Sequence, residues 1–365
     1  MNKEEVIKMQ ISRIEKEIRD TPYHKGTEHH HGVLKAKLSK LKDELNGAGA
    51  KSGGGGGTGY AIKHSGDASV VLVGLPSVGK STLLNAVTNA ESKVGNYDFT
   101  TLGVVPGMMN YKGVNIQILD LPGIIEGAAG NKGFGRKVLS VIRASDLVVL
   151  MTDVKRLNWF NVVEQELYNS GIRLNTRPPK MIVTKTDKGA IQVIDPYKSF
   201  DKKVVEEVAK EMGCSNAIVA FGEKIENVDK LIDGFVKTRK YMPAVNLVTK
   251  VDLAKDTEIK KIPHGSIKMS VGRGVGIEEF KEKVWQGLGL VRVYLRRDRN
   301  GLADKNDPLI VKNTNTLDDV LRVISNQMRD DVSRAYIWGK KARFPGQEVS
   351  FNLPVFDEME VWFGR

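Results

Sequence analysis

The sequence predicts an α/β protein whose central domain contains a mostly parallel sheet. From residue 69 onward, short apolar segments alternate with helical patterns, which is typical of a parallel α/β sheet. A glycine-rich motif directly follows the first of these apolar segments. The chain has 365 residues, of which 41% are hydrophobic and 27% are charged. It is therefore long enough for two or three domains, each with its own core.

Composition excludes several classes of protein. No apolar run approaches the roughly 18 residues that a membrane-spanning helix needs, and the N-terminal sequence lacks the apolar region of a signal peptide. Cys214 is the only cysteine, which excludes an intrachain disulfide and a cysteine-based zinc site. We therefore expect a cytoplasmic protein without membrane contact. The formal net charge of +12 favours polyanionic partners, because Lys and Arg release counterions from phosphate backbones.

Residues 1–50 predict two antiparallel helices. Pro22 interrupts the helical pattern, and Thr27 is a candidate N-cap for the second helix. Three adjacent histidines, 29–31, point in different directions on a helix, so we expect no metal site there. Residues 51–66 form a glycine-rich linker. Apolar residues at helical spacing define the two helices: Ile7, Ile11, Ile14 and Ile18, then Leu34, Leu38, Leu41 and Leu45.

The central sheet is interrupted by an insert. Between the apolar strands that end at residue 151 and begin at residue 244 lie 92 residues, whereas a strand–helix–strand unit needs only about 30. We therefore expect residues 67–172 and 241–290 to form one domain, with residues 173–240 as an inserted α/β module. The expected strands of the sheet are 69–73, 114–119, 147–151 and 244–248.

The insert and the C-terminal region each predict a small domain of strands and helices. In the insert we expect strands near 181–183 and 217–219 and helices near 204–212 and 228–236. Residues 291–365 predict a separate α+β domain. Its expected elements are strands at 309–311, 335–338 and 359–362 and a helix at 317–328.

Residues 74–81 match the pattern G-x-x-x-x-G-K-[ST] between a strand and a helix, which is the context that this motif requires. Backbone N–H groups of such a loop surround phosphate oxygens, and the helix N-terminus adds positive potential. We expect Lys80 to reach the β- and γ-phosphates of a nucleotide and the Ser81 hydroxyl to ligate Mg²⁺. The other predicted nucleotide-binding residues of this segment are Gly74, Pro76, Ser77, Val78, Gly79 and Thr82.

Two further segments predict contacts with the terminal phosphate. Asp120 ends a predicted strand, where its carboxylate can hold Mg²⁺ through water, and Gly123 can offer its N–H group to the γ-phosphate. Two adjacent threonines, Thr100 and Thr101, lie between the glycine-rich loop and this segment. We choose Thr101 as a direct Mg²⁺ ligand. The predicted catalytic residues are Lys80, Thr101 and Gly123.

Two segments are candidates for recognising the base of the nucleotide. Residues 184–187 and 249–252 both read Thr-Lys-x-Asp, a pattern whose aspartate accepts two hydrogen bonds from guanine. We choose the second, because it directly follows an apolar strand, and we interpret Asp187 as part of a solvated turn. The predicted base contacts come from Thr249, Lys250 and Asp252, and from a backbone N–H group at Ser270 or Val271 that can meet guanine O6.

Several stretches of the sequence resemble a known family. The stretches GLPSVGKSTLLNAVT, FTTL, DLPGIIEGA and TKVD are similar to the Obg-like GTPases. The stretches TEHHHGVLKAKLSKL, GGGGGTGYAIKHSGDA, ELYNSGIRLNTRPPK and AYIWGKKARFPGQEV narrow the resemblance to the Drg family (developmentally regulated GTP-binding proteins) in its archaeal form. The resemblance covers essentially the whole chain. It implies an N-terminal helix-turn-helix, a G domain with an inserted S5D2-like module, and a C-terminal TGS domain of β-grasp type.

The sequence departs from common GTPase patterns at two positions. Thr249 replaces the usual asparagine, so we expect the bonds from this position to the glycine-rich loop to be lost. Ile124 stands where Ras-like enzymes carry a glutamine that positions water, which is typical of the Drg family. Some Obg-like relatives use K⁺ together with an asparagine in the loop, where this chain has Ser77, so K⁺ dependence stays open.

The resemblance implies a slow, Mg²⁺-dependent hydrolysis of GTP to GDP and a role as a switch on ribosomes or ribosomal RNA. A protein cofactor is also implied, and a monomer is favoured, although the sequence does not determine the oligomeric state. Two alternatives stay open: an RNA-binding module that the nucleotide only stabilises, and a P-loop ATPase or kinase.

Overall fold

The protein is described here from a computed structural model. The described residues are 2–46, 66–88, 104–121, 135–324 and 332–364.

The chain divides into two compact units. The first contains Met1–Gly59 and Asn161–Met242, and the second contains Tyr60–Phe160 and Pro243–Arg365. Residues 161–172, which the sequence analysis assigned to the central domain, thus fall in the same unit as the insert and the N-terminal helices.

The second unit contains the expected, mostly parallel sheet. Its strand order is β11-β10-β4-β1-β3-β2, and all neighbours pair in parallel except β2 and β3. The sequence analysis did not identify β2, since Pro106 and Gly107 are uncommon in strands; β2 lies at the sheet edge, where proline is tolerated. The strands are β1 (Ala68–Gly74), β2 (Val105–Tyr111), β3 (Val114–Asp120), β4 (Leu147–Asp153), β10 (Ala244–Thr249) and β11 (Ile267–Lys268).

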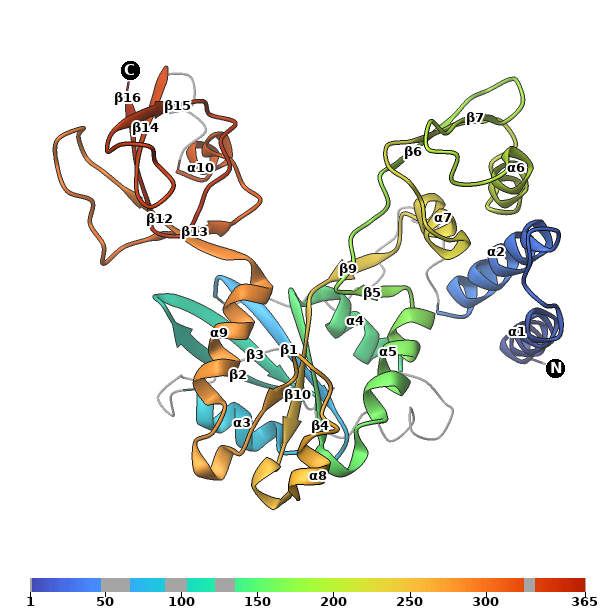
Figure 1. The fold of residues 1–365 in the computed structure, drawn as a ribbon, viewed down its shortest axis with the longest axis horizontal. Helices are drawn as coiled ribbons and strands as arrows, with labels where there is room; N and C mark the ends of the chain where they lie inside the picture. The colour runs from blue at the N-terminus through green and yellow to red at the C-terminus, as the bar shows by residue number, and fades with distance from the viewer. Residues whose placement is uncertain (1, 47–65, 89–103, 122–134, 325–331, 365) are drawn as a thin grey trace. The chain divides into compact units, whose positions relative to one another are not determined.

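Helices cover this sheet because its strands are apolar on both faces, as parallel sheets require. All residues of β1 are buried. Helices α3 (Lys80–Val87) and α9 (Ile277–Leu288) pack on one face, where Leu83 and Phe280 join a single core with Leu72 (Figure 1). The remaining helices of this region are α4 (Arg136–Ala144), α8 (Asp256–Ile259) and the 3-10 turns η1 (Val154–Arg156), η2 (Val251–Leu253) and η3 (Val271–Arg273).

The turn between β2 and β3 is fixed to α9. The Tyr111 hydroxyl and the Lys112 ammonium both donate to the Glu282 carboxylate, over 2.9 and 2.8 Å. These bonds, led by the one from Lys112, lower the pKa of Glu282 to about 2. The turn therefore anchors the far end of β3, the strand that ends at Asp120.

In the described residues of the C-terminal part of the second unit, a five-stranded mixed sheet packs with the helix α10. Its order is β13-β12-β16-β14-β15, and Val320 of α10 packs on a core that includes Val293 and Val361. The sequence analysis missed β12 and β15. The elements are β12 (Leu290–Leu295), β13 (Leu309–Lys312), α10 (Leu317–Ile324), β14 (Arg334–Trp338), β15 (Gln347–Val349) and β16 (Met359–Gly364).

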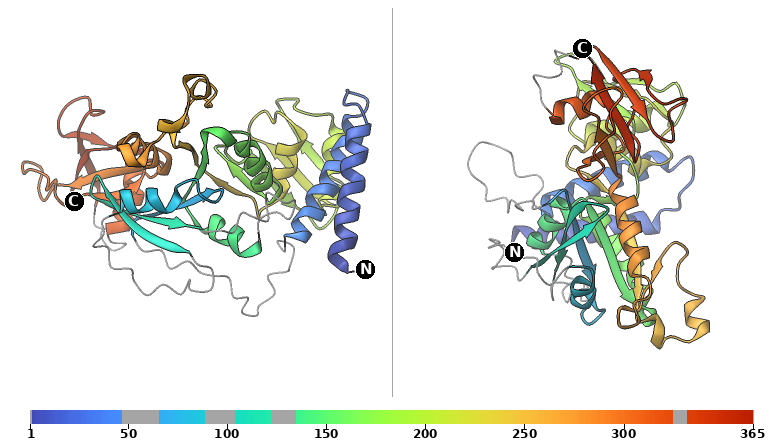
Figure 2. Two further views of the ribbon diagram at one scale, coloured as in Figure 1. Left: turned by 90° about the horizontal axis from the view of Figure 1, so that it is seen from below. Right: turned by 90° about the vertical axis from the view of Figure 1, so that its left-hand side faces the viewer.

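In the first unit, two helices at the N-terminus run in opposite directions. Lys3 of α1 (Lys3–Asp20) pairs with Glu44 of α2 (Glu28–Leu45), and Glu17 pairs with His30, so the start of each helix meets the end of the other. The two helices lie side by side, as the left view of Figure 2 shows. Thr27 occupies the N-cap position of α2 without capping it by a side-chain bond.

The adjacent histidines 29–31 have three different partners. His29 pairs with Glu207 and His30 with Glu17, while the buried His31 ring bonds the Thr21 carbonyl oxygen over 2.9 Å. Among the described residues, no group of three metal-ligating side chains is present.

The insert has the expected mixture of strands and helices. Its sheet has the order β6-β8-β7, and α2 packs against α6 and α7 of this module. A short parallel pair, β5 with β9, joins the two ends of the insert. The elements are β5 (Ile172–Leu174), β6 (Met181–Lys185), β7 (Gln192–Ile194), α6 (Lys202–Glu211), β8 (Ala217–Phe221), α7 (Val228–Phe235) and β9 (Lys240–Met242), and the helix α5 (Trp159–Asn169) precedes them.

No helix among the described residues is long and apolar enough to span a membrane.

Candidate functional site

The glycine-rich loop joins the end of β1 to the start of α3. Ser77 and Gly79 have backbone φ angles of 60° and 90°, so the chain turns through the left-handed region twice within three residues. A Cβ atom on Gly74 would lie 2.6 Å from the carbonyl oxygen of Met151, so only glycine fits where the loop passes β4. The loop therefore has the tight curvature that lets backbone N–H groups face a phosphate.

Lys80 points back into this loop. Its ammonium donates to the carbonyl oxygens of Gly74 and Leu75, over 3.0 and 3.2 Å, and the residue is only 7% exposed. Burial lowers the pKa of Lys80, while the nearby Asp120 carboxylate acts in the opposite direction. The cation thus lies against the glycine-rich loop, and its predicted contact with the nucleotide phosphates stays a prediction.

Ser81 and Asp120, which are 39 residues apart, come together at the start of α3. The Ser81 hydroxyl donates to Asp120 Oδ2 over 2.7 Å. Asp120 is 1% exposed, and its second oxygen, Oδ1, is buried without a hydrogen-bond partner in the described part of the chain. A buried carboxylate oxygen normally has a partner, and Mg²⁺ with its bound water prefers oxygen ligands such as these. The two side chains therefore fit a magnesium site.

Thr249, at the end of β10, is bonded to the glycine-rich loop. Its hydroxyl lies 2.7 Å from the carbonyl oxygen of Val78 and 3.1 Å from that of Thr152, and the residue is 3% exposed. The expectation that threonine loses the bonds to the loop is therefore wrong. Because β10 pairs with β4, with Thr249 opposite Asp153, even a short hydroxyl side chain reaches the loop.

Lys250 makes a second bond to the same loop. Its backbone is left-handed, with a φ of 58°, and its ammonium donates to the carbonyl oxygen of Ser77 over 2.7 Å. The lysine stem therefore runs from β10 to the loop. Thr249 and Lys250 together fasten the predicted base-reading segment to the predicted phosphate-binding segment.

Asp252 and Ser270 meet beside these residues. A hydrogen bond from Ser270 and the charge of Arg273, 3.9 Å away, lower the pKa of Asp252. The Ser270 N–H group donates to the carbonyl oxygen of Val275, so Val271 is the better candidate of the two for guanine O6. The sequence analysis did not identify Arg273, whose contact depends on the turn η3.

Comparisons with known proteins agree with this geometry. Residues 69–185 match the family model described as 50S ribosome-binding GTPase, and residues 188–290 match the C-terminal region of that domain. A GTP-binding protein of Halobacterium salinarum is 40% identical over 95% of this chain and 96% of its own length. Developmentally-regulated G-protein 3 of Arabidopsis thaliana is 37% identical over 96% of this chain and 97% of its own. Ribosome-interacting GTPase 1 of Saccharomyces cerevisiae is 37% identical over 95% and 96%.

The chain belongs to the Drg family. It is a GTP-binding protein and a GTPase, as the resemblance implied. In this Drg protein, the other Thr-Lys-x-Asp segment lies in the insert. Asp187 is exposed at the end of β6, which pairs with β8 rather than with any strand of the central sheet. The interpretation of Asp187 as a solvated turn agrees with this position.

Three residues that the sequence analysis singled out lie outside the described residues of this Drg protein. Thr101 falls within 89–103, and Gly123 and Ile124 fall within 122–134. Their predicted roles in catalysis and metal binding stay predictions.

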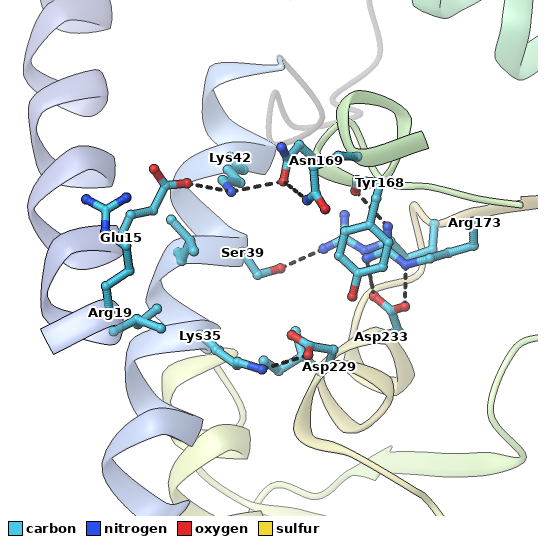
Figure 3. Close-up of a pocket in the computed structure, with 15 residues that line it drawn as sticks. Glu15, Arg19, Lys35, Ser39, Lys42, Tyr168, Asn169, Arg173, Asp229 and Asp233 are labelled. Atoms are coloured by element: carbon cyan, nitrogen blue, oxygen red, sulfur yellow. Dashed lines mark hydrogen bonds and ion pairs between the residues drawn. The ribbon is translucent and has the colours of Figure 1, made fainter. Parts of the chain in front are cut away.

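A cavity of about 620 Å³ lies in the first unit, and none of the residues that line it is predicted to bind the nucleotide (Figure 3). Most of its cations are already paired: Arg173 with Asp233 over 2.6 Å, and Lys35 with Asp229 over 2.7 Å. The Arg173 guanidinium also lies 3.7 Å from the centroid of the Tyr168 ring. These contacts tie α2, β5 and α7 together, so the arrangement is that of a structural ion-pair network.

Proposed function

We propose that this GTPase depends on Mg²⁺ and acts as a switch that associates with ribosomes according to its bound nucleotide. The observation that carries the proposal is the pair of bonds from Thr249 and Lys250 to the carbonyl oxygens of Val78 and Ser77. They bring a guanine-reading segment to the phosphate-binding loop, and Asp120 meets Ser81 at the start of the following helix. Base recognition and phosphate chemistry thus share one edge of one sheet.

In this proposal the chain's own residues position and neutralise the nucleotide. Lys80 contacts the β- and γ-phosphates, and the Gly123 N–H group contacts the γ-phosphate. Ser81 and Thr101 would hold Mg²⁺ directly and Asp120 would hold it through water; when bound there, Mg²⁺ would supply positive charge that neutralises the phosphates. Asp252 accepts hydrogen bonds from the N1–H and N2–H₂ groups of guanine. The other nucleotide contacts come from Gly74, Pro76, Ser77, Val78, Gly79, Thr82, Thr249, Lys250, Ser270 and Val271.

Ile124, in place of a glutamine, affects the expected intrinsic rate of GTP hydrolysis. Because the isoleucine side chain cannot orient the attacking water as a glutamine does, we expect intrinsic turnover near or somewhat above ~10⁻⁴ s⁻¹, the scale of an unassisted Ras-type enzyme. Turnover of about 10 s⁻¹ without a partner would contradict this assignment, since that is an ordinary enzymatic rate. Comparing turnover in K⁺ and Na⁺ buffers tests whether K⁺ contributes.

The proposed ribosome association has two supports. One relative is named a ribosome-interacting GTPase, and the matching family model is described as a 50S ribosome-binding GTPase. The net charge of +12 also suits an RNA surface, where binding should weaken with salt. We further propose that the protein is a cytoplasmic monomer that works with a protein cofactor.

The appended regions are proposed to carry that association. We assign residues 1–50 as a helix-turn-helix, 173–240 as an S5D2-like insert within the G domain (67–172 and 241–290), and 291–365 as a TGS domain of β-grasp type. The five-stranded sheet with α10 supports the last assignment. A protein that lacks residues 291–365 should bind GTP normally but bind ribosomes less well.

Two assays separate this proposal from its alternatives. Steady-state turnover of GTP and ATP, with and without ribosomes, distinguishes a GTPase from an ATPase or kinase and from an RNA-binding module with negligible turnover. Co-sedimentation with ribosomal subunits, under GDP and under a non-hydrolysable GTP analogue, tests the switch. Absence of co-sedimentation at low salt in every nucleotide state would overturn the ribosome part of the proposal.

A further inference from the structure

The loop between β14 and β15, residues 339–346, exposes an aromatic ring among cations. Phe344 is 59% exposed, although a phenylalanine side chain normally contributes to a core. Residues 334–347 contain no acidic side chain. The cations in that stretch are Arg334, Lys340, Lys341 and Arg343, all of them exposed.

This loop, called the β14–β15 loop below, is held in one conformation by its own hydrogen bonds. The Ala342 N–H group donates to the carbonyl oxygen of Gly339 over 3.0 Å, and the Arg343 N–H group donates to the Gln347 side chain over 2.8 Å. At its end, the Gly346 N–H group donates to the carbonyl oxygen of Ile337 over 3.1 Å. Phe344 therefore faces solvent from a turn that hydrogen bonds stabilise.

The charges of the β14–β15 loop are poorly neutralised. Lys340 lies 3.4 Å from Glu358, but its side chain is 86% exposed, so this pair contributes little. Lys341 lies 5.7 Å from the Phe356 ring centroid. Within the described part of the chain, neither Lys341 nor Arg343 forms an ion pair with a carboxylate. The loop therefore combines available positive charge with an available aromatic face.

We propose that the β14–β15 loop binds a single-stranded segment of RNA, with Phe344 stacking on an unpaired base and Lys341 and Arg343 contacting phosphates. This inference rests on the proposed ribosome association and names one surface that carries it. Base–aromatic stacking beside cations is the usual way that proteins bind unpaired nucleotides. A duplex has no free base face for Phe344, and an acidic protein partner would need the cations but not the ring.

The test measures anisotropy of a fluorescein-labelled 12-nucleotide single-stranded RNA with the full-length protein in GDP. Removing the ring in Phe344→Ala should weaken binding about 5-fold to 100-fold, which is the scale of one stacked base, while Phe344→Tyr should bind within about twofold of the wild type. The matched control is Leu302→Ala in the same domain, where Leu302 is 89% exposed, and it should not change affinity. Unchanged thermal unfolding shows that each variant is folded.

Charge is tested separately in the same assay. Lys341→Glu with Arg343→Glu should weaken binding further and make the salt dependence shallower, by about 0.7 in log–log slope for each lost phosphate contact. Lys188→Glu, an exposed lysine of the insert, is the control for charge alone. An RNA duplex of the same length should bind more weakly than the single strand and should be insensitive to Phe344→Ala.

Four results would overturn the inference: equal RNA binding by Phe344→Ala and wild type, an equal loss in Leu302→Ala, equal ribosome co-sedimentation by wild type and the loop variants, or loss of ribosome co-sedimentation by the loop variants without any binding of free RNA. The last result would assign the loop to a protein partner. If wild-type protein co-sediments with ribosomes and the loop variants do so equally well, only this inference fails. If wild-type protein does not co-sediment at all, the proposed ribosome association itself fails.

Discussion

Residues 184–187 and 249–252 carry the same pattern, Thr-Lys-x-Asp, in two different surroundings. In the first, Thr184, Lys185 and Asp187 are all exposed at the end of β6 in a three-stranded sheet. In the second, Thr249 is buried and bonded to the glycine-rich loop. The match to the GTPase family model even ends within the first segment, at residue 185. The difference teaches that a base-reading motif is defined by the strand that carries it and by what lies next to that strand.

The largest expected effect is on GTP turnover. It tests whether hydrolysis depends on the glycine-rich loop, which the second segment contacts and the first does not. Lys80→Ala removes a charge-assisted donor to the phosphates, so GTP turnover should fall by about 100-fold or more. Lys185→Ala removes an exposed lysine of the first segment and should leave turnover unchanged. Phosphate release under saturating GTP measures both. If Lys185→Ala loses as much turnover as Lys80→Ala, the first segment also acts on the nucleotide, and its assignment to a solvated turn is wrong.

The next effect concerns base choice. Asp252→Asn should weaken GTP binding by a factor of up to about 10⁴ and should favour xanthosine triphosphate, whose O2 replaces the guanine amino group. Asp187→Asn should leave the affinity for both nucleotides unchanged. Competition against a fluorescent GDP analogue measures the two affinities. Equal affinity of the wild type for ATP and GTP would also rule out Asp252 as a guanine reader.

A smaller effect comes from the threonines. Thr249→Val keeps the shape of the side chain but leaves the Val78 carbonyl oxygen without its buried partner, which should cost about 1–3 kcal/mol. Thr184→Val changes an exposed side chain and should change the free energy of unfolding by no more than about 0.5 kcal/mol. Urea unfolding monitored by circular dichroism compares them. Similar values for the two variants would argue that the bond to the loop is dispensable.

The smallest effect is a pH dependence at Asp252. Because Ser270 and Arg273 lower its pKa below the ordinary 3.8, the carboxylate stays ionised, and base recognition stays intact, down to a lower pH than an ordinary aspartate allows. The ratio of GDP to IDP affinities isolates the base from phosphate titration, since IDP lacks only the N2 amino group. This ratio should be constant from pH 7 to about 5.

The Ser270→Ala variant sharpens that measurement. It removes the main cause of the lowered pKa, so the GDP to IDP ratio should begin to fall at a higher pH than in the wild type. If the two proteins lose discrimination at the same pH, the Ser270 hydroxyl does not act on Asp252.

The sequence by itself determined the elements whose signal is local. The glycine-rich loop and the helix after it occupy consecutive residues, so one short stretch specifies both the turn and the phosphate-facing N–H groups. The strands β1, β3, β4 and β10 were also predictable, because mostly apolar segments are what a parallel sheet covered on both faces requires.

Tertiary structure decided what depends on residues far apart in the chain. The Thr249 hydroxyl reaches a carbonyl oxygen 171 residues away, and Ser81 meets Asp120 only because β1 and β3 are neighbours. No local pattern reports which strand lies beside which, because hydrogen-bond distances are set by strand order and register. The sequence contained two aspartate motifs and favoured the second, but only strand pairing brings that second motif to the glycine-rich loop.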